Sequence, residues 1–288
     1  MSQTDTCKQI SFSWDIHYKC NYNCPYCWWY GKWAELAKDN LYPSLDTLLK
    51  IWTDIYKKYG TAHIEILGGE PLIYPNFNEL IKELSKMHTV RITTNLSTSI
   101  DALLKNTSPS RVSITGTFHP LFAEFNDFVQ KAVLLKKNSR GNSVIYLAYP
   151  PQIKLIPYYK ERFIEYGLKL SVMSFWGENN GKAYPENYTE EETAYITPHL
   201  GKGRGEKYQL RPRLVKGKLC RAGQIYASIK SNGDVARCGG NAPRYLGNIF
   251  KGDFKLLGEP TPCESDICPC NEWASFLLVE KKNNNNEN

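Results

Sequence analysis

Apolar positions along residues 10–196 follow two alternating spacings, one typical of strands and the other of helices. Residues 10–18 carry an apolar side chain at every second position, which predicts a half-buried strand. Ser44 can cap a following helix whose apolar residues recur every three or four positions until Gly60. Further strands are expected at 63–67, 90–96, 111–118, 144–149 and 168–175. Further helices are expected at 77–87, 99–106, 122–135 and 158–167.

Strands and helices in alternation predict a mainly parallel sheet with right-handed crossovers, and therefore an α/β fold. Six such strands suit either an open doubly wound sheet or a full or partial (β/α) barrel. Both architectures collect active-site residues at the carboxyl ends of the strands, so we expect the chemistry of this chain at those ends.

The last part of the chain has a different character. A final helix is expected at 187–196, followed by a basic stretch and a segment rich in cysteine and glycine. This segment has only short strand patterns, at 224–229 and 234–238, and we expect a second module to begin near residue 205. The terminal NNNNEN is of low complexity and is expected to be disordered.

Composition places the chain among folded, water-soluble proteins. It has 288 residues, of which 42% are hydrophobic and 23% charged, which is enough for a large buried core. No apolar run approaches the ~18 residues of a membrane span, and no signal peptide is visible, so we expect a cytoplasmic protein without a membrane partner. Nine cysteines are an odd number and too few for a disulfide scaffold, and their clustering suggests metal binding.

Positive charge is concentrated in one stretch. The formal net charge is +7, and residues 201–218 hold seven Lys or Arg side chains against one Glu. This stretch is either a solvated linker or a site of attraction for a phosphate-bearing or acidic substrate. Because such runs are more common in linkers, a nucleic-acid partner is not expected.

Three cysteines follow the first strand at a spacing suited to an iron–sulfur cluster. Cys20, Cys24 and Cys27 can each hold one iron of a 4Fe-4S cubane and leave the fourth iron open for a substrate or cofactor. The alternative is a structural zinc site completed by His17, although zinc sites favour two paired Cys-x2-Cys arms.

The spacing Cys-x3-Cys-x-aromatic-Cys, with Tyr26 as the aromatic residue, resembles the hallmark of the radical S-adenosylmethionine (SAM) enzymes. The residues Gly68, Gly69, Glu70 and Pro71, at the end of the second strand, resemble the GGEP motif of the same family. In that family this backbone binds the amino group of SAM, whose amino nitrogen and carboxylate chelate the open iron. Alone, the motif would be an ordinary turn, since glycines permit positive φ and close backbone approach.

The resemblance implies an architecture and a set of cofactors. Residues 1–200 would form a partial (β/α)6 barrel of TIM type, residues 201–280 a small cysteine-rich auxiliary-cluster module, and residues 281–288 a disordered tail. The implied cofactors are a 4Fe-4S cluster, SAM and a second, auxiliary 4Fe-4S cluster. The implied partners are an electron donor such as flavodoxin or ferredoxin and a small-molecule substrate.

Polar residues at the ends of the third and fourth strands are candidates for the remaining SAM contacts. Asn95 ends the third strand, and Thr115 and Thr117 end the fourth, where the ribose hydroxyls and the carboxylate would lie. Asn and Thr are also common in turns, where they form local hydrogen bonds, and this is the alternative explanation for each.

The later strand ends supply further candidates. Ser174, with Tyr149 and Trp176, would contact SAM or the substrate, although the two aromatic residues are equally suited to a core. His119 could act as the catalytic residue in proton transfer, or it could simply satisfy local hydrogen bonds.

Five cysteines in the last segment form a second candidate metal site. Cys220, Gly233 and Cys238 spell Cys-x12-Gly-x4-Cys, which resembles the start of the SPASM and twitch auxiliary modules of radical SAM enzymes. A full SPASM module has seven cysteines, so the resemblance implies a twitch with one 4Fe-4S cluster. The remaining ligands would come from the final group, as Cys268 and Cys270, with Cys263 as the alternate ligand or a spare thiol. A closed zinc site of four of these cysteines is the structural alternative.

The resemblance implies an oxidoreductase or isomerase that reductively cleaves SAM to a 5′-deoxyadenosyl radical, which takes hydrogen from an unactivated C–H bond. We expect a small polar substrate of sugar, cyclitol or nucleotide type, and dehydrogenation or epimerisation as the outcome. The small substrate is preferred because 288 residues leave no room for a separate leader-binding domain, and the second hypothesis is a ribosomally made peptide presented by a partner. The third is a non-catalytic iron–sulfur or zinc protein.

Overall fold

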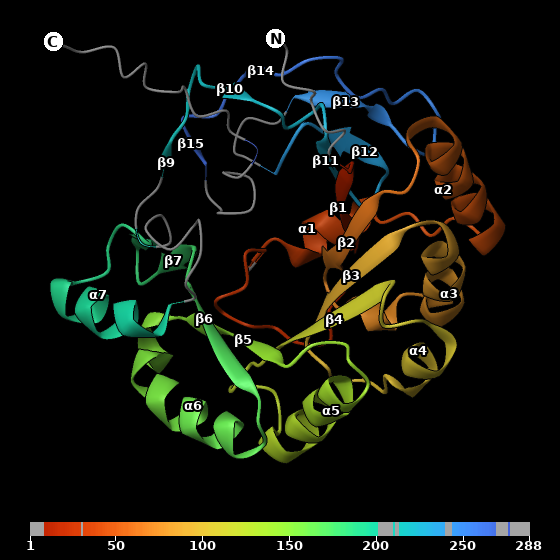
Figure 1. Ribbon diagram of the computed structural model, residues 1–288. Coiled ribbons are helices and arrows are strands. Elements are labelled where there is room, and N and C mark those ends of the chain that lie inside the picture. Colours follow the sequence, from red (N-terminus) through yellow and green to blue (C-terminus); the bar gives the residue numbers. More distant parts are fainter. Residues whose placement is uncertain are drawn as a thin grey trace, which may run out of the picture.

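The computed structural model describes residues 9–29, 31–200, 210, 213–239, 244–268 and 276 (Figure 1). The tail at 281–288, the basic residues 201–209 and Cys270 lie outside these residues.

Six parallel strands form the main body of the sheet and follow one another in chain order. They are β1 (Ser11–His17), β2 (His63–Gly68), β3 (Thr89–Thr94), β4 (Val112–Thr117), β5 (Ser143–Ala148) and β6 (Lys169–Ser174). Their order and parallel pairing confirm the predicted α/β fold of partial-barrel type. The carboxyl ends of all six strands therefore meet at one edge of the sheet.

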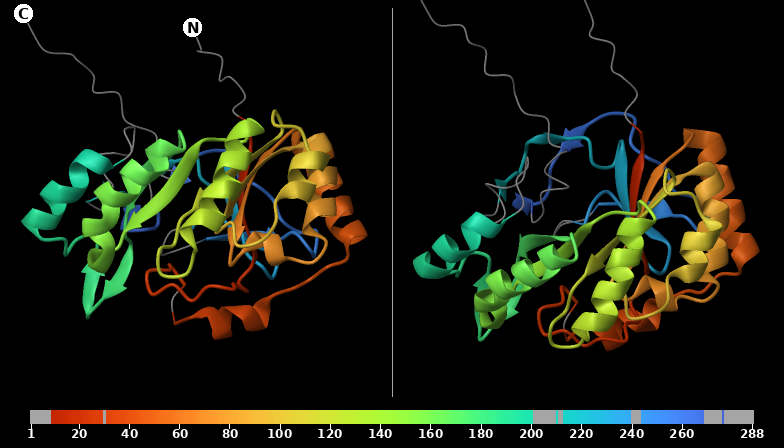
Figure 2. Two further views of the ribbon diagram at one scale, coloured as in Figure 1. Left: turned by 90° about the horizontal axis from the view of Figure 1, so that it is seen from below. Right: turned by 60° about the horizontal axis from the view of Figure 1, so that its bottom comes forward.

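Helices cover the outer side of this curved sheet, as Figures 1 and 2 show. They are α2 (Leu45–Tyr59), α3 (Phe77–Met87), α4 (Asp101–Asn106), α5 (Phe125–Lys137) and α6 (Ile156–Glu165). Ser44 caps α2 as predicted, because its Oγ accepts a hydrogen bond from the Thr47 N–H at 3.2 Å, and the helix ends at Gly60. The main core lies between these helices and the sheet, where Phe12 of β1 meets Trp52 of α2 with ring centroids 5.7 Å apart.

Strand β1 is more deeply buried than its alternating pattern predicted. Six of its seven residues are buried, so the expectation of a half-buried strand is wrong. The apolar face packs on α2 through Trp14, whose ring lies 5.4 Å from that of Trp52. The polar face is covered as well, because the Asp15 carboxylate accepts hydrogen bonds from Lys230 Nζ and Tyr18 Oη, each at 3.1 Å.

Strands from the C-terminal part extend the same sheet beyond β1. β11 (Tyr226–Ile229) pairs with β1 in parallel, and β12 (Asp234–Ala236) and β13 (Tyr245–Asn248) continue the sheet in antiparallel pairs. The sheet order is β13-β12-β11-β1-β2-β3-β4-β5-β6, and Figure 2 shows the blue strands beside the red β1. The two short strands predicted in this region are confirmed, whereas their pairing with β1 was not expected from the sequence.

Shorter elements complete the described part of the chain. Two-stranded ladders pair β7 (Gly177–Asn179) with β8 (Lys182–Tyr184), β9 (Arg213–Leu214) with β15 (Ile267–Cys268), and β10 (Leu219–Cys220) with β14 (Thr261–Pro262). Helix α1 (Trp33–Leu36) follows the first cysteine loop, and α7 (Glu190–Ile196) begins with a capping box of Thr189 and Glu192. No helix among these residues is both long and apolar enough to cross a membrane.

Candidate active site

The three cysteines of the first motif lie in the loop that leaves the carboxyl end of β1. Cys24 is buried, and Cys20 and Cys27 are half-buried. The Tyr22 N–H donates to Cys20 Sγ at 3.4 Å, and the Cys27 N–H donates to the Cys24 carbonyl at 3.0 Å. Burial raises the pKa of Cys24 to about 12 and that of Cys27 to about 11. A bound metal, as a positive partner, would favour the thiolate form of both.

The two glycines at the end of β2 allow this strand to approach the cysteine loop closely. The Gly69 N–H donates to the His17 carbonyl at 2.7 Å, and the Glu70 N–H donates to the Lys19 carbonyl at 3.0 Å. A Cβ on Gly68 would overlap the His17 carbonyl oxygen, and a Cβ on Gly69 would overlap that of Lys19. Gly68 also has a φ of +121°, which disfavours other residues. Both glycines are thus required by the contact between two protein segments.

Glu70 joins the ends of β2 and β3. Its buried carboxylate accepts hydrogen bonds from Thr94 Oγ1 at 2.6 Å, the Asn95 N–H at 2.7 Å and the Leu72 N–H at 2.9 Å. Burial raises the pKa of Glu70, although these hydrogen bonds favour its charged form. Pro71 is buried at the first position of the short 3-10 turn that follows. The carboxylate is therefore occupied by protein groups.

The Asn95 side chain is also engaged within the protein. Its Oδ1 accepts from the Ser97 N–H at 2.9 Å, and its Nδ2 donates to Asn21 Oδ1 at 3.0 Å. Asn21 Nδ2 donates in turn to Ser97 Oγ at 2.8 Å. Because Asn21 lies between Cys20 and Cys24, these bonds connect the cysteine loop to the end of β3.

His119 stands beside the aromatic residues of the cysteine loop. Its ring stacks on Tyr26, with centroids 5.6 Å apart and planes 14° apart, and meets the edge of Tyr22 at 6.0 Å. The Tyr26 ring also lies 5.1 Å from the Tyr149 ring. Burial lowers the pKa of His119 to about 4, so its imidazole is neutral at pH 7.

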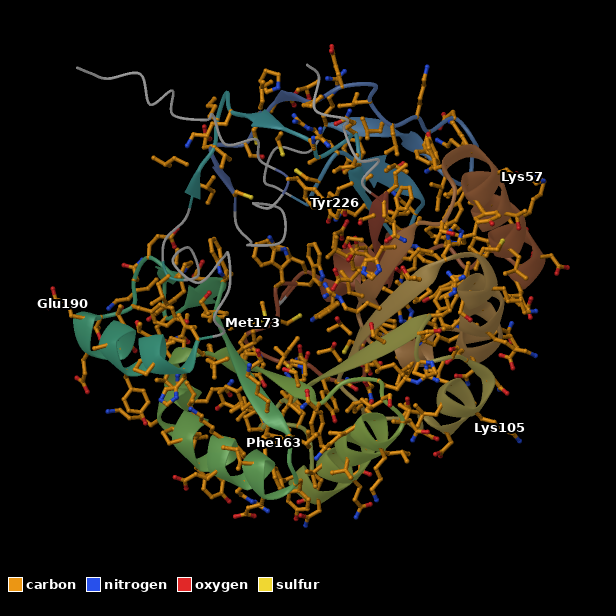
Figure 3. The ribbon with its side chains drawn as sticks, viewed as in Figure 1. Lys57, Lys105, Phe163, Met173, Glu190 and Tyr226 are labelled. Atoms are coloured by element: carbon orange, nitrogen blue, oxygen red, sulfur yellow. The ribbon has the colours of Figure 1, made fainter. Side chains whose placement is uncertain are left out.

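One cavity of about 180 Å³ brings most of the predicted residues together. The predicted residues that line it are Cys20, Cys24, Cys27, Tyr26, Gly68, Gly69, Glu70, Asn95, Thr117 and His119. Pro71, Thr115 and Ser174 are not among its lining residues. Thr115 lies two positions before Thr117 on β4, farther from the carboxyl end, and Ser174 Oγ accepts from Trp176 Nε1 at 3.0 Å. Figure 3 shows the side chains that fill the arc of strands.

Several lining residues were not singled out from the sequence. They are Tyr22, Trp28, Trp33, Leu67, Thr93, Thr94 and Leu147. Tyr22 and Trp28 lie inside and directly after the cysteine motif, so their position in the chain was an available signal. Trp33 in α1 and Leu147 in β5 carried no such signal, because only the fold brings them to the cavity.

Four cysteines of the second group gather around one small apolar cluster. Cys220 is buried in it with Val215, Ala222 and Tyr226, and the cysteines packed against it are Cys238, Cys263 and Cys268. Cys270 lies outside the described residues. Gly233 lies in the turn between β11 and β12, where its φ is +85° and a Cβ would overlap the Phe250 ring. The glycine of the second motif is therefore required by this turn.

The donor chemistry of both groups fits iron–sulfur clusters. Among the described residues, no three Cys, His, Asp or Glu side chains already stand at metal-binding distances from one another. The chain nevertheless gathers three thiols at the cavity and four at the second group, and thiolate is the usual ligand of iron–sulfur clusters. His17, the alternative zinc ligand, is fully buried, and its Nε2 forms a hydrogen bond with the Glu70 carbonyl at 2.9 Å.

Comparisons with known proteins agree with this geometry. Residues 14–133 match the Radical SAM superfamily, and this span contains the first cysteine motif and residues 68–71. No curated protein matches the chain.

Solved structures share the fold at low sequence identity. Streptococcus suis SuiB bound to S-adenosylmethionine is 18% identical, with a TM-score of 0.59, and the match covers 85% of this chain and 64% of SuiB. The anSMEcpe structure with bound AdoMet is 17% identical, with a TM-score of 0.63, and the match covers 93% of this chain and 82% of anSMEcpe. The chain thus spans less than two thirds of the length of SuiB.

The match to the family covers the two strand ends at which the structure places the cysteine loop and the Gly-Gly-Glu-Pro turn. The resemblance expected from the sequence is therefore confirmed, and the shared fold includes the strands that follow the barrel. This chain is therefore similar to the radical SAM superfamily over residues 14–133.

Proposed function

We propose that this radical SAM enzyme abstracts hydrogen from a small polar substrate of sugar, cyclitol or nucleotide type, in a dehydrogenation or epimerisation. The observation that carries the proposal is the meeting of the three motif cysteines, the Gly68 and Gly69 backbone and His119 at one cavity. The polar residues Thr93, Thr94, Asn95 and Thr117 also line it, and of these the Thr94 hydroxyl and the Asn95 amide are already bound by protein groups. Such a lining suits a ligand rich in hydrogen-bonding groups.

The cysteines and the glycine backbone would hold the cofactors. Cys20, Cys24 and Cys27 would bind the 4Fe-4S cluster, because they are the thiols that border the cavity. When bound, the cluster and SAM supply the electron and the 5′-deoxyadenosyl radical that takes hydrogen from a C–H bond. Gly68 and Gly69 present backbone without side chains to the same space, where an amino group can approach.

Tyr26, Thr117 and His119 would orient the substrate and SAM. His119 Nδ1 is buried without a hydrogen-bond partner among the described residues. A neutral imidazole has one nitrogen that can accept a hydrogen bond or a proton. His119 can therefore accept a hydrogen bond from a substrate hydroxyl. Its stacking on Tyr26 fixes the plane of the ring. Thr115 and Ser174 lie outside the cavity lining and have less support as SAM contacts.

A peptide is the second candidate substrate. SuiB has been solved with its precursor peptide SuiA, and anSMEcpe with the Kp18Cys peptide. Both structures share the fold of this chain, with TM-scores of 0.58 and 0.61. Deoxyadenosine formation that rises with polyols or nucleotides, and not with peptides, would favour the small substrate. The opposite result would favour the peptide.

Metal analysis after anaerobic reconstitution tests the class of protein. We expect brown protein with two 4Fe-4S clusters, about eight iron atoms per chain and only trace zinc. With a reductant, for which we propose a flavodoxin or ferredoxin, it should form 5′-deoxyadenosine from SAM. The triple variant Cys20→Ala/Cys24→Ala/Cys27→Ala should keep about half of the iron and lose all SAM cleavage.

Cys7→Ala is the matched control, since Cys7 belongs to neither cysteine motif, and it should keep both the iron and the cleavage. A colourless protein that binds zinc would contradict the proposal. So would a triple variant that still cleaves SAM.

A further inference from the structure

Arg237 is a buried charged side chain in the C-terminal part of the chain, and only 4% of its surface is exposed. All three of its guanidinium nitrogens donate to backbone carbonyls. Nε donates to Ala222 at 2.7 Å and Nη1 to Pro262 at 2.5 Å. Nη2 donates to Cys220 at 3.2 Å and to Thr261 at 2.6 Å. Four carbonyls from two segments thus converge on one side chain.

These carbonyls belong to the segments that carry the second group of cysteines. Cys220 is itself an acceptor, and Thr261 and Pro262 lie directly before Cys263 in the chain. The same segments pair as β10 and β14, with Cys220 opposite Thr261. Cys238 follows Arg237. One guanidinium therefore fastens the backbone beside three cysteines.

Among the described residues, no carboxylate forms an ion pair with the Arg237 guanidinium. Carbonyls satisfy its N–H groups but leave its positive charge without an opposite charge. A buried charge of this kind is costly unless an anion lies close to it. The cysteines on the segments that Arg237 holds would supply such an anion when a cluster binds them as thiolates.

We propose that Arg237 is the positioning residue of the auxiliary 4Fe-4S cluster, and that Cys263 is a ligand of this cluster together with Cys220 and Cys238. The inference rests on the auxiliary cluster of the proposed function. Cys268, which packs in the same group, is the fourth ligand. This assignment makes Cys263, the alternate ligand or spare thiol of the sequence prediction, a ligand in place of Cys270, which lies outside the described residues.

Arg237 would act in two ways. Its planar fork holds the ligand-bearing backbone segments at fixed positions, which a flexible lysine with a single ammonium cannot reproduce. Its fixed positive charge favours the reduced, more negative state of a thiolate-bound cluster and so raises the reduction potential. Arg237→Gln removes both effects, whereas Arg237→Lys keeps the charge and loses the fork.

The test uses the full-length triple variant of Cys20, Cys24 and Cys27, in which the auxiliary cluster is the remaining source of iron. In this background we expect Arg237→Gln to lose more than half of the iron and to lower the midpoint potential of the remaining cluster. Arg237→Lys should restore the potential but not the full iron content. Cys263→Ala should lose the 4Fe-4S spectrum.

Arg140→Gln is the matched control. Arg140 is also 4% exposed, and its guanidinium donates to the carbonyls of Val112 at 2.9 Å, Leu104 at 3.3 Å and Thr107 at 2.5 Å. Leu104 lies in α4, Thr107 directly follows α4, and Val112 lies in β4, so this variant should keep the auxiliary iron and its potential. In the background with all cysteines present, Arg237→Gln should retain the first cluster, which shows that the barrel still folds.

Unchanged iron and potential in Arg237→Gln would overturn the role of Arg237. A full 4Fe-4S spectrum in Cys263→Ala would overturn the ligand assignment. A triple variant without any iron, beside a wild type with one cluster, would refute the auxiliary cluster itself and this inference with it. SAM cleavage by the wild type would then leave the rest of the proposed function standing, so the two failures are distinguishable.

Discussion

His88 is a fully buried histidine that joins two parts of the core. Its Nδ1 accepts a hydrogen bond from the Ala62 N–H at 3.1 Å, so Nε2 carries the proton and donates to the Trp52 carbonyl, also at 3.1 Å. Burial lowers the pKa of His88 from its ordinary value of 6.5. The folded protein therefore holds the neutral ring, and protonation of His88 favours unfolding.

This arrangement predicts that His88 stabilises the fold less as the pH falls below about 6.5. Below this pH the His88 ring is protonated in the unfolded chain but remains neutral in the folded chain. The free energy of unfolding of the wild type, relative to His88→Gln, should be greatest above pH 7. It should then fall by up to about 1.4 kcal/mol per pH unit until the folded pKa is reached. Urea unfolding of both proteins from pH 7.5 to 5 measures this difference. A difference independent of pH would mean that His88 titrates normally in the folded state.

Single residues also show where sequence reasoning stops. The sequence predicted that Asn95 lies at a strand end. It could not predict that the side-chain amide of Asn95 binds Asn21 and Ser97, because Asn21 is distant in the chain and Ser97 is close. The same holds for Cys263, whose partners depend on the pairing of β10 with β14. Residue type and strand ends predict which residues reach the site, whereas hydrogen bonds made in the fold decide what each one does.

Among the elements, the junction of β1 and β2 is the most tightly constrained. Gly69→Ala should cost about 1–3 kcal/mol of stability, because its new Cβ must displace the Lys19 carbonyl next to the cysteine loop. The loss of the Gly69–His17 hydrogen bond should also reduce iron incorporation at the first site. Urea unfolding and iron analysis measure the two effects.

Gly31→Ala is the control for backbone strain. Gly31 has a positive φ, +74°, which Gly69 does not have, and nothing lies within 4 Å of a Cβ placed there. Its cost should stay near 1 kcal/mol, with the iron content unchanged. A cost of Gly69→Ala no greater than that of Gly31→Ala would mean that the close approach of β1 and β2 is not the important factor.

For the whole molecule, the pairing of β11 with β1 makes the C-terminal part necessary to the barrel. Phe254 reaches the same core as Phe12, with ring centroids 6.2 Å apart, and Lys230 neutralises Asp15 on the polar side of β1. A chain that ends at residue 200 should therefore expose the edge of β1 and associate, which size-exclusion chromatography would detect.

A chain that ends at residue 280 is the control and should elute as the full-length protein does. A monomeric, cooperatively folded 1–200 fragment would show instead that the six barrel strands suffice. That result would support the division at residue 200 expected from the sequence.

The sequence predicted the six barrel strands and α2 because their spacings are local properties of the chain. Ser44 and Gly60 marked both ends of α2 for the same reason. It could not predict that β11 lies beside β1, since short strands carry no information about distant partners. The burial of the polar face of β1 depends on this pairing, so it was not predicted either.

The same pairing sets an order of events during synthesis. Asp15 and its partner Lys230 are separated by 215 residues, which a ribosome adds in roughly 10–40 s at 5–20 residues per second. During that interval β1 can pair with β2 and bring the cysteine loop toward the Gly-Gly turn, while its other edge has no strand to bind. The first cysteine site can thus be assembled on a nascent chain, whereas the segment bearing Cys238 and Cys263 has not yet been made. Iron delivered early would therefore reach the first site before the auxiliary one exists.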